Sequence, residues 1–139
     1  CINNYEKRMK HYFSFEILII PDIKKMGKLS PDQIKKKEGD LILNHINMSD
    51  RNIILDEKGK QFSSVGFARF LTKHFNYDHR NITFIIGGPY GFTDFIYDQV
   101  KEKISLSKMT FSHQIIRILF MEQLYRAFTI IKGDPYHHN

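Results

Sequence analysis

The sequence predicts an α/β fold, in which a parallel sheet is covered by helices on both faces. Short apolar runs of strand length alternate along the chain with longer segments that begin at helix-capping residues, as a parallel sheet with right-handed crossovers requires. The run ITFII at 82–86 is apolar at nearly every position, which is typical of a strand buried on both faces. Because no internal repeat or low-complexity linker divides the 139 residues, we expect a single domain over 1–139.

The expected helices begin at recognisable caps. Ser30 is followed by Pro31 at the first helical position and by Gln33 three residues on, which is the pattern of a capping box. Ser63 and Thr93 precede helical segments in a similar way. The predicted helices are 2–10, 31–46, 64–75, 94–101 and 111–131, the last of them stopped by Gly133 and Pro135.

Strands are predicted where apolar runs end at turn residues or charged residues, at 13–20, 51–55, 82–86 and 103–106. The first run ends at Pro21, the second at the charged segment 56–60, and the third enters the glycine-rich loop 87–91. Open α/β sheets bind ligands outside the carboxyl ends of their strands, where glycine lets ligand atoms approach the backbone. The loop 87–91 and the segment 106–111 therefore predict a ligand cleft.

The composition limits the class of protein. The formal net charge of +6 favours an anionic partner, because basic side chains neutralise phosphates and release counterions. Cys1 is the only cysteine, which excludes an internal disulfide, and no segment resembles a signal peptide or a membrane span. We therefore expect a soluble, cytoplasmic protein. The seven histidines show no recognised metal-ligand spacing, so we expect no metal.

The last predicted helix is apolar on several faces, at Ile115, Ile116, Ile118, Leu119, Phe120, Met121, Leu124, Tyr125, Ala127, Phe128, Ile130 and Ile131. A helix of this kind in a small domain needs either an enveloping core or a second chain to cover it. We expect a homodimer through this C-terminal helix. The alternative is a helix packed wholly inside its own subunit.

The glycine-rich loop 87–91 (GGPYG) does not by itself identify a ligand. It does not match the dinucleotide pattern G-x-G-x-x-G, and no segment matches the phosphate-binding pattern G-x-x-x-x-G-K-[ST]. NAD and nucleoside triphosphates are therefore disfavoured. Glycine and proline are ordinary turn residues, so a tight turn between strand and helix explains the loop equally well.

Several segments together resemble one family. They are YEKR at 5–8, LDEKGK at 55–60, IIGGPYG at 85–91, ISLSKMTFSHQ at 104–114, EQLYRAF at 122–128 and GDPYH at 133–137. These segments resemble the RlmH family of ribosomal large-subunit methyltransferases, which belong to the SPOUT class. The resemblance extends over nearly the whole chain.

The resemblance implies a Rossmann-like domain whose C-terminal segment forms a deep trefoil knot and which works as a homodimer. General topology rules do not predict a knot. The resemblance also implies that the cofactor is S-adenosyl-L-methionine and that the protein methylates N3 of a pseudouridine in helix 69 of 23S rRNA, within the assembled ribosome. The reaction is then an in-line displacement at the sulfonium methyl. It requires mainly that the donor and the target base are held in the right geometry and that N3 loses its proton.

Site residues follow from the same resemblance. The residues expected to hold the methyl donor, mainly through backbone groups, are Leu55, Gly87, Gly88, Leu106, Ser107, Lys108, Met109, Thr110 and Phe111. The residues expected to orient the target base or move its proton are Tyr136, His137, Arg126, Glu122 and His113, with Tyr136 and His137 foremost. Without the family, a terminal Tyr-His pair is commonly a frayed tail, and Glu122 and Arg126, four residues apart, can simply form an ion pair on a helix surface.

Some basic residues are expected to contact the rRNA, while most are solvated; the candidates are Lys7, Arg8, Lys10, Lys24, Lys25, Lys28, Lys35, Lys36 and Lys37. Two other functions fit the same residues. One is a non-catalytic ribosome- or RNA-binding module on this scaffold, and the other is a SPOUT enzyme that acts on tRNA.

The chain departs from the family pattern at three places. The family usually begins with a short strand and a glycine turn, whereas this chain begins inside the helix that follows them, so we expect the sheet to lack one strand. We also expect the natural N-terminus to lie upstream, because the first residue is not methionine. Ser112 stands where proline is frequent, and His138 and Asn139 replace the usual basic terminus.

Overall fold

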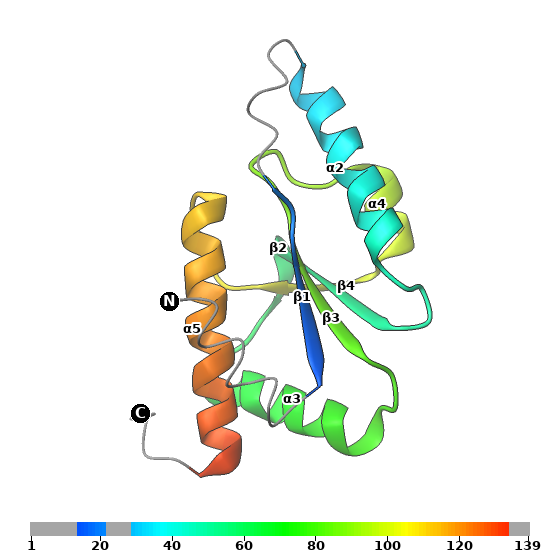
Figure 1. Cartoon of the computed structure of the whole chain (residues 1–139). Coiled ribbons are helices and arrows are strands. Elements are labelled where there is room, and N and C mark those ends of the chain that lie inside the picture. Colours follow the sequence, from blue (N-terminus) through cyan, green and yellow to red (C-terminus); the bar gives the residue numbers. More distant parts are fainter. Residues whose placement is uncertain (1–13, 22–28, 134–139) are drawn as a thin grey trace.

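The computed structural model describes residues 14–21 and 29–133, and in this part of the chain it shows one parallel sheet with helices on both faces (Figure 1). The strands are β1 (Phe15–Ile19), β2 (Arg51–Gln61), β3 (Ile82–Ile86) and β4 (Glu102–Ser105), and they lie in the order β1-β3-β2-β4. The helices are α2 (Pro31–His45), α3 (Ser64–Tyr77), α4 (Asp94–Gln99) and α5 (His113–Lys132). The predicted α/β class is confirmed, whereas the predicted helix 2–10 lies outside the described residues.

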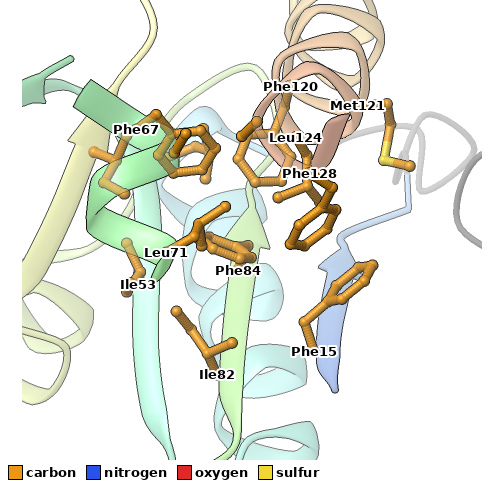
Figure 2. Close-up of a cluster of buried hydrophobic side chains, with 14 of the residues drawn as sticks. Phe15, Ile53, Phe67, Leu71, Ile82, Phe84, Phe120, Met121, Leu124 and Phe128 are labelled. Carbon is orange, nitrogen blue, oxygen red and sulfur yellow. The ribbon is translucent and has the colours of Figure 1, made fainter. Parts of the chain in front are cut away.

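A hydrophobic core lies on each face of the sheet, because successive residues of a strand point to opposite faces. Ile53 and Leu55 of β2 belong to the larger core, which also contains residues of α3 and α5, whereas Ile54 belongs to the smaller core with residues of α2 and α4. Figure 2 shows the larger core, in which Phe84 of β3 packs against both Phe67 and Phe120, with ring centroids 6.2 and 5.0 Å away. The central strand β3 is buried throughout, as its apolar sequence predicted.

The predicted caps determine where the helices begin. In the capping box of α2, Gln33 N–H donates to Ser30 Oγ over 3.2 Å and Ser30 N–H donates to Gln33 Oε1 over 2.9 Å. Ser63 and Thr93 cap α3 and α4 through their side chains. The prediction that the last helix begins at residue 111 is wrong by two residues, because Ser112 is the N-cap of α5 and has an extended backbone.

The clearest correction concerns β2, which was expected to end at residue 55 but continues to Gln61. Leu55 and Lys60 both pair with Ile104 of β4, so the residues between them form a wide irregularity in the strand. Gly59 lies in this bulge, where a Cβ would come within 2.7 Å of the Ile104 nitrogen. Only glycine allows this close approach of β2 to β4.

The smaller differences lie at the ends of elements. Helix α4 ends at Gln99 rather than at residue 101, because Val100 takes an extended backbone and buries its side chain in the smaller core. Helix α5 ends at the predicted Gly133, which adopts a left-handed conformation with φ of 75°. Within the described ranges, none of the helices combines the length and the apolar character that crossing a membrane requires.

Candidate functional site

A cavity of about 470 Å³ lies at the carboxyl ends of β3 and β4 and beside the bulge in the middle of β2, and the segments 87–91 and 106–111 line it as the sequence predicted. The loop 87–91 follows β3 and the segment 106–111 follows β4, and residues of both line the cavity although they are far apart in the sequence. The third side is formed by the bulge of β2. A cavity of this size is typical of sites for small molecules.

The loop 87–91 forms one wall of the cavity, and two of its glycines lie close to neighbouring side chains. A Cβ on Gly87 would lie 2.8 Å from the Phe92 ring, and one on Gly88 would lie 2.0 Å from Oε2 of Glu38, a buried residue of α2. Gly91 has a φ of 81°, which favours glycine. Because Gly87 and Gly88 have no side chains, they line the cavity with backbone atoms alone.

The segment 106–111 is held in place by hydrogen bonds of its serine and threonine side chains. Ser105 Oγ donates to the Ser107 carbonyl over 2.9 Å, and the Met109 N–H donates to Ser107 Oγ over 2.9 Å. Thr110 Oγ1 donates to Glu57 Oε2 over 3.3 Å, which ties this segment to the bulge of β2. These bonds support the segment where it borders the cavity, as is needed in a binding loop.

The bulge of β2 places charged side chains in the cavity wall. Asp56, Glu57 and Lys58 all line it, and the Lys58 N–H donates to Asp56 Oδ1 over 2.8 Å. The hydroxyl of Tyr97, on α4, donates to Asp56 Oδ2. Burial, together with the Asp56 carboxylate, raises the pKa of Tyr97, so the phenol stays protonated and remains a donor.

Sequence reasoning missed Asp56 and Tyr97 as site residues. The available signal was a glycine in a strand-like run next to charged residues at 56–60, which is typical of a bulge that re-aims side chains. Tyr97 gave no signal, because a tyrosine on a short helix is most often part of a core.

The structure gathers nearly all of the residues that were predicted to hold the methyl donor. Those that line the cavity are Leu55, Gly87, Gly88, Leu106, Ser107, Met109, Thr110 and Phe111. Lys108 is exposed and lies outside the lining. Whether these residues bind a ligand stays a prediction.

The residues predicted to act on the target base are not all brought together. His113, the first residue of α5, lines the cavity. Glu122 and Arg126 lie further along α5, outside the lining, and form an ion pair with 2.7 Å between Arg126 Nη2 and Glu122 Oε1. Tyr136 and His137 lie outside the described residues.

The lining combines apolar surface with groups that can bind polar or charged parts of a ligand. Leu55, Ile86 and Phe92 supply apolar area, and carboxylates come from Asp56, Glu57 and Asp94. Over residues 14–21 and 29–133, no three His, Cys, Asp or Glu side chains come together as a metal site requires. Of the predicted rRNA contacts in the described part, Lys35 lines the cavity, and Lys36 and Lys37 are exposed on α2.

A parallel sheet whose strand ends carry a glycine-rich loop, a hydrogen-bonded second loop and a shared cavity defines an α/β protein with a cavity at the edge of its sheet where such proteins commonly bind ligands. The model of a protein family described as "Predicted SPOUT methyltransferase" matches residues 1–137 of the chain. The chain belongs to this family of SPOUT methyltransferases.

Curated relatives agree with the family. A "Ribosomal RNA large subunit methyltransferase H" of Christiangramia forsetii is 53% identical over 137 residues, which cover 99% of this chain and 87% of that protein. Proteins of the same name from Parabacteroides distasonis and Bacteroides thetaiotaomicron are 51% and 48% identical over 138 residues, again 99% of this chain and 88% of each relative. The resemblance stated from the sequence motifs is confirmed.

Proposed function

We propose that the protein is an S-adenosyl-L-methionine-dependent methyltransferase that modifies N3 of a pseudouridine in helix 69 of 23S rRNA, in the assembled ribosome. The observation that carries the proposal is the cavity that the loop 87–91 and the segment 106–111 share at the strand ends. The names of the relatives support a substrate in the RNA of the large ribosomal subunit.

The lining fits S-adenosyl-L-methionine. The donor combines a flat aromatic base with polar edges, ribose hydroxyls, a sulfonium and an amino-acid end with an ammonium and a carboxylate. The cavity offers apolar side chains, backbone groups of Gly87 and Gly88, and carboxylates. A cavity of about 470 Å³ lies in the range typical of small-molecule sites. When bound, the donor supplies an electrophilic methyl group on a sulfonium. The surrounding residues position it for in-line attack.

The target base has to lose its N3 proton before N3 can attack the methyl carbon. His113 lines the cavity and is therefore the described candidate for holding or accepting that proton. Arg126 and Glu122 are proposed to orient the base through their ion pair, because a paired guanidinium keeps a fixed direction. Tyr136 and His137, outside the described residues, complete the proposed catalytic set.

We also propose a homodimer through α5. Ile115 and Ile118 on this helix are 47% and 59% exposed, and Met109 and Phe111 just before it are exposed as well. Exposed apolar side chains gathered on one stretch of chain favour a protein partner. The deep trefoil knot, the single domain over 1–139 and the cytoplasmic location, where ribosomes are found, belong to the same proposal.

The direct test is methyl transfer to ribosomes. Purified protein and labelled S-adenosyl-L-methionine are incubated with ribosomes from a strain that lacks this modification, and the modified nucleotide is mapped by mass spectrometry. We expect one N3-methylated pseudouridine in helix 69. Label in tRNA, and none in ribosomes, would favour a SPOUT enzyme acting on tRNA instead.

A second measurement separates an enzyme from a non-catalytic module. Calorimetric titration with S-adenosyl-L-methionine should give saturable heat if the cavity holds the donor. A protein that binds ribosomes and gives no heat with the donor would contradict the enzymatic proposal and favour an RNA-binding module.

A further inference from the structure

One carboxylate in the cavity is held more firmly than the others. Asp56 accepts two hydrogen bonds, from the backbone N–H of Lys58 at 2.8 Å and from the hydroxyl of Tyr97, and each reaches a different oxygen. Both donors are uncharged. Asp56 is half-buried, whereas the other lining carboxylates, Glu57 and Asp94, are exposed.

The Asp56 carboxylate makes no ion pair with any basic side chain of the described residues. Two neutral donors leave several of its acceptor positions available, since an ionised carboxylate can accept about four hydrogen bonds. A fixed carboxylate with unused acceptor positions in a cavity wall is suited to a ligand that brings donors of its own.

The donor molecule of the proposed function offers four groups to such a carboxylate: the sulfonium, the α-ammonium, the amino group of adenine and the ribose diol. The amino group presents its N–H donors from a single nitrogen at the edge of the base, whereas the diol presents two adjacent hydroxyls to one carboxylate. A carboxylate beside the sulfonium would oppose catalysis, because the positive charge on sulfur is smaller in the transition state, so the ground state would be stabilised more. The α-ammonium is strongly hydrated, so the exposed Glu57 and Asp94 are better placed for it.

The ribose diol fits best. Its two hydroxyls are neutral donors that need acceptors in a fixed geometry, and in other α/β nucleotide-binding proteins an acidic side chain accepts from the ribose hydroxyls. Asp56 follows Leu55 at the bulge of β2, beside the loop 87–91 that follows the neighbouring strand. The nucleoside part of a ligand would lie between these two segments.

We propose that Asp56 accepts hydrogen bonds from the ribose hydroxyls of the methyl donor and that Tyr97 is its positioning residue. The inference rests on the proposed use of S-adenosyl-L-methionine. Tyr97 holds one carboxylate oxygen through its hydroxyl, and Lys103 Nζ lies 4.8 Å from the centre of its ring, which holds the ring from another side.

The test compares ligands with and without the diol. The dissociation constants of adenosine and 2′,3′-dideoxyadenosine are measured by competition against S-adenosylhomocysteine, for the wild-type protein and for Asp56→Asn. In the wild type we expect the dideoxy compound to bind about tenfold to a hundredfold more weakly, as for hydrogen bonds to a charged group. In Asp56→Asn the difference should shrink severalfold from the wild-type value, to between about twofold and tenfold, as for hydrogen bonds to a neutral group.

Tyr97→Phe keeps the carboxylate and removes only its hydroxyl partner. We expect the ratio of the two dissociation constants to fall to an intermediate value, which a purely structural role of Tyr97 would not produce. This variant also keeps the test available if Asp56→Asn fails to fold. The matched controls are Asp98→Asn, an exposed charge on the same helix, and Tyr77→Phe, an exposed phenol on α3, and both should keep the wild-type ratio.

The outcomes separate this inference from the proposed function. A wild-type ratio in both Asp56→Asn and Tyr97→Phe, in a protein that still binds S-adenosylhomocysteine, would overturn the ribose contact and leave the methyltransferase proposal intact. Weaker binding of S-adenosylhomocysteine to Asp56→Asn, with the ratio unchanged, would place the carboxylate on another part of the ligand. A wild-type protein that binds none of these nucleosides would overturn both proposals.

Discussion

Gly88 shows how closely the cavity wall is packed against the helix behind it. A Cβ at this position would lie 2.0 Å from Oε2 of the buried Glu38. We expect Gly88→Ala to lower the free energy of unfolding by about 1–3 kcal/mol, because either the carboxylate or the loop has to move, and to weaken binding of S-adenosylhomocysteine. Urea unfolding followed by circular dichroism measures the stability, and calorimetry measures the binding.

Gly91→Ala serves as the comparison, because this glycine has open space around it and a φ of 81°. Its substitution strains the backbone by about 1–2 kcal/mol without touching Glu38. If both variants lost the same binding affinity, strain of the loop rather than contact with Glu38 would explain the effect, and the close packing of Gly88 would have no part in the site.

We expect His74 to make the stability of the fold depend on pH. Its ring is buried, and Nδ1 lies 3.1 Å from Nη1 of Arg51, which also forms two 2.7 Å hydrogen bonds with Glu102. Burial and the charge of Arg51 lower the pKa of His74 from 6.5, against a smaller opposing effect of Asp78. The unfolded chain therefore binds a proton at a higher pH than the folded chain does, so stability is lost as the pH falls below about 6.5.

The measurement is urea unfolding at several pH values between 8 and 5 for the wild type and for His74→Gln, which keeps a polar side chain next to Arg51. We expect the free energy of unfolding of the wild type to fall more steeply with acidification than that of the variant. Parallel curves would show that other groups account for the acid sensitivity. Asp78, whose pKa is lowered mainly by its hydrogen bonds from Arg80, adds to the loss only in stronger acid.

At the scale of elements, the bulge of β2 determines the shape of the site, and Gly59 determines the bulge. A Cβ at Gly59 would lie 2.7 Å from backbone atoms of Lys103 and Ile104. We expect Gly59→Ala to push β4 away from β2 and to lower the free energy of unfolding by about 2 kcal/mol or more. The atoms that the new Cβ would contact belong to the backbone, which cannot relieve the contact by changing rotamer as a side chain can. Thermal and urea unfolding measure the cost.

Gln61→Ala is the matched control, since this residue ends the same strand and is exposed. Its cost should stay within about 0.5 kcal/mol. A Gly59→Ala protein as stable as Gln61→Ala would show that β2 and β4 can separate freely, which would contradict the role given to the bulge.

The elements that the sequence predicted best are those with local signals. Strand β3 has the predicted ends at Ile82 and Ile86, because an apolar run between a polar residue and a glycine pair needs no information from other parts of the chain. Helix α2 begins where Ser30 and Gln33 predicted, since a capping box is closed within four residues. Strand β2 could not be delimited in this way, because its second half is defined by pairing with β4, which comes about forty residues later.

The residues of the candidate site also differ in whether a local sequence signal predicts them. Residues of the loop 87–91 and of the segment 106–111 were predicted, because they directly follow apolar strands, and both segments line the cavity. The link between Asp56 and Tyr97 could not be predicted, since two residues 41 positions apart meet only once the sheet and α4 are packed. The apolar character of α5 predicted a helix, but not which of its residues are exposed.

At the scale of the whole molecule, exposed apolar side chains gather where α5 begins, next to the cavity. Met109 and Ile118 are 72% and 59% exposed, and Phe111 and Ile115 lie between them in the sequence and are exposed too. Further along α5, by contrast, Phe120, Met121, Leu124, Ala127 and Phe128 are buried in the larger core. The first half of α5 therefore has apolar surface that its own core does not use, which supports the proposed dimer.

Ile118→Glu tests that dimer with little disturbance of the fold, because the side chain is largely exposed in the single chain. We expect the wild type to sediment as a dimer at micromolar concentration and the variant to shift toward monomer, since a charge in an apolar interface is costly to desolvate. Asn44→Glu adds the same charge at an exposed position of α2, which packs on the other face of the sheet from α5, and it should sediment like the wild type. A wild type that is monomeric would instead mean that this surface meets a different partner, and because it borders the cavity, the ribosome would then be the first candidate.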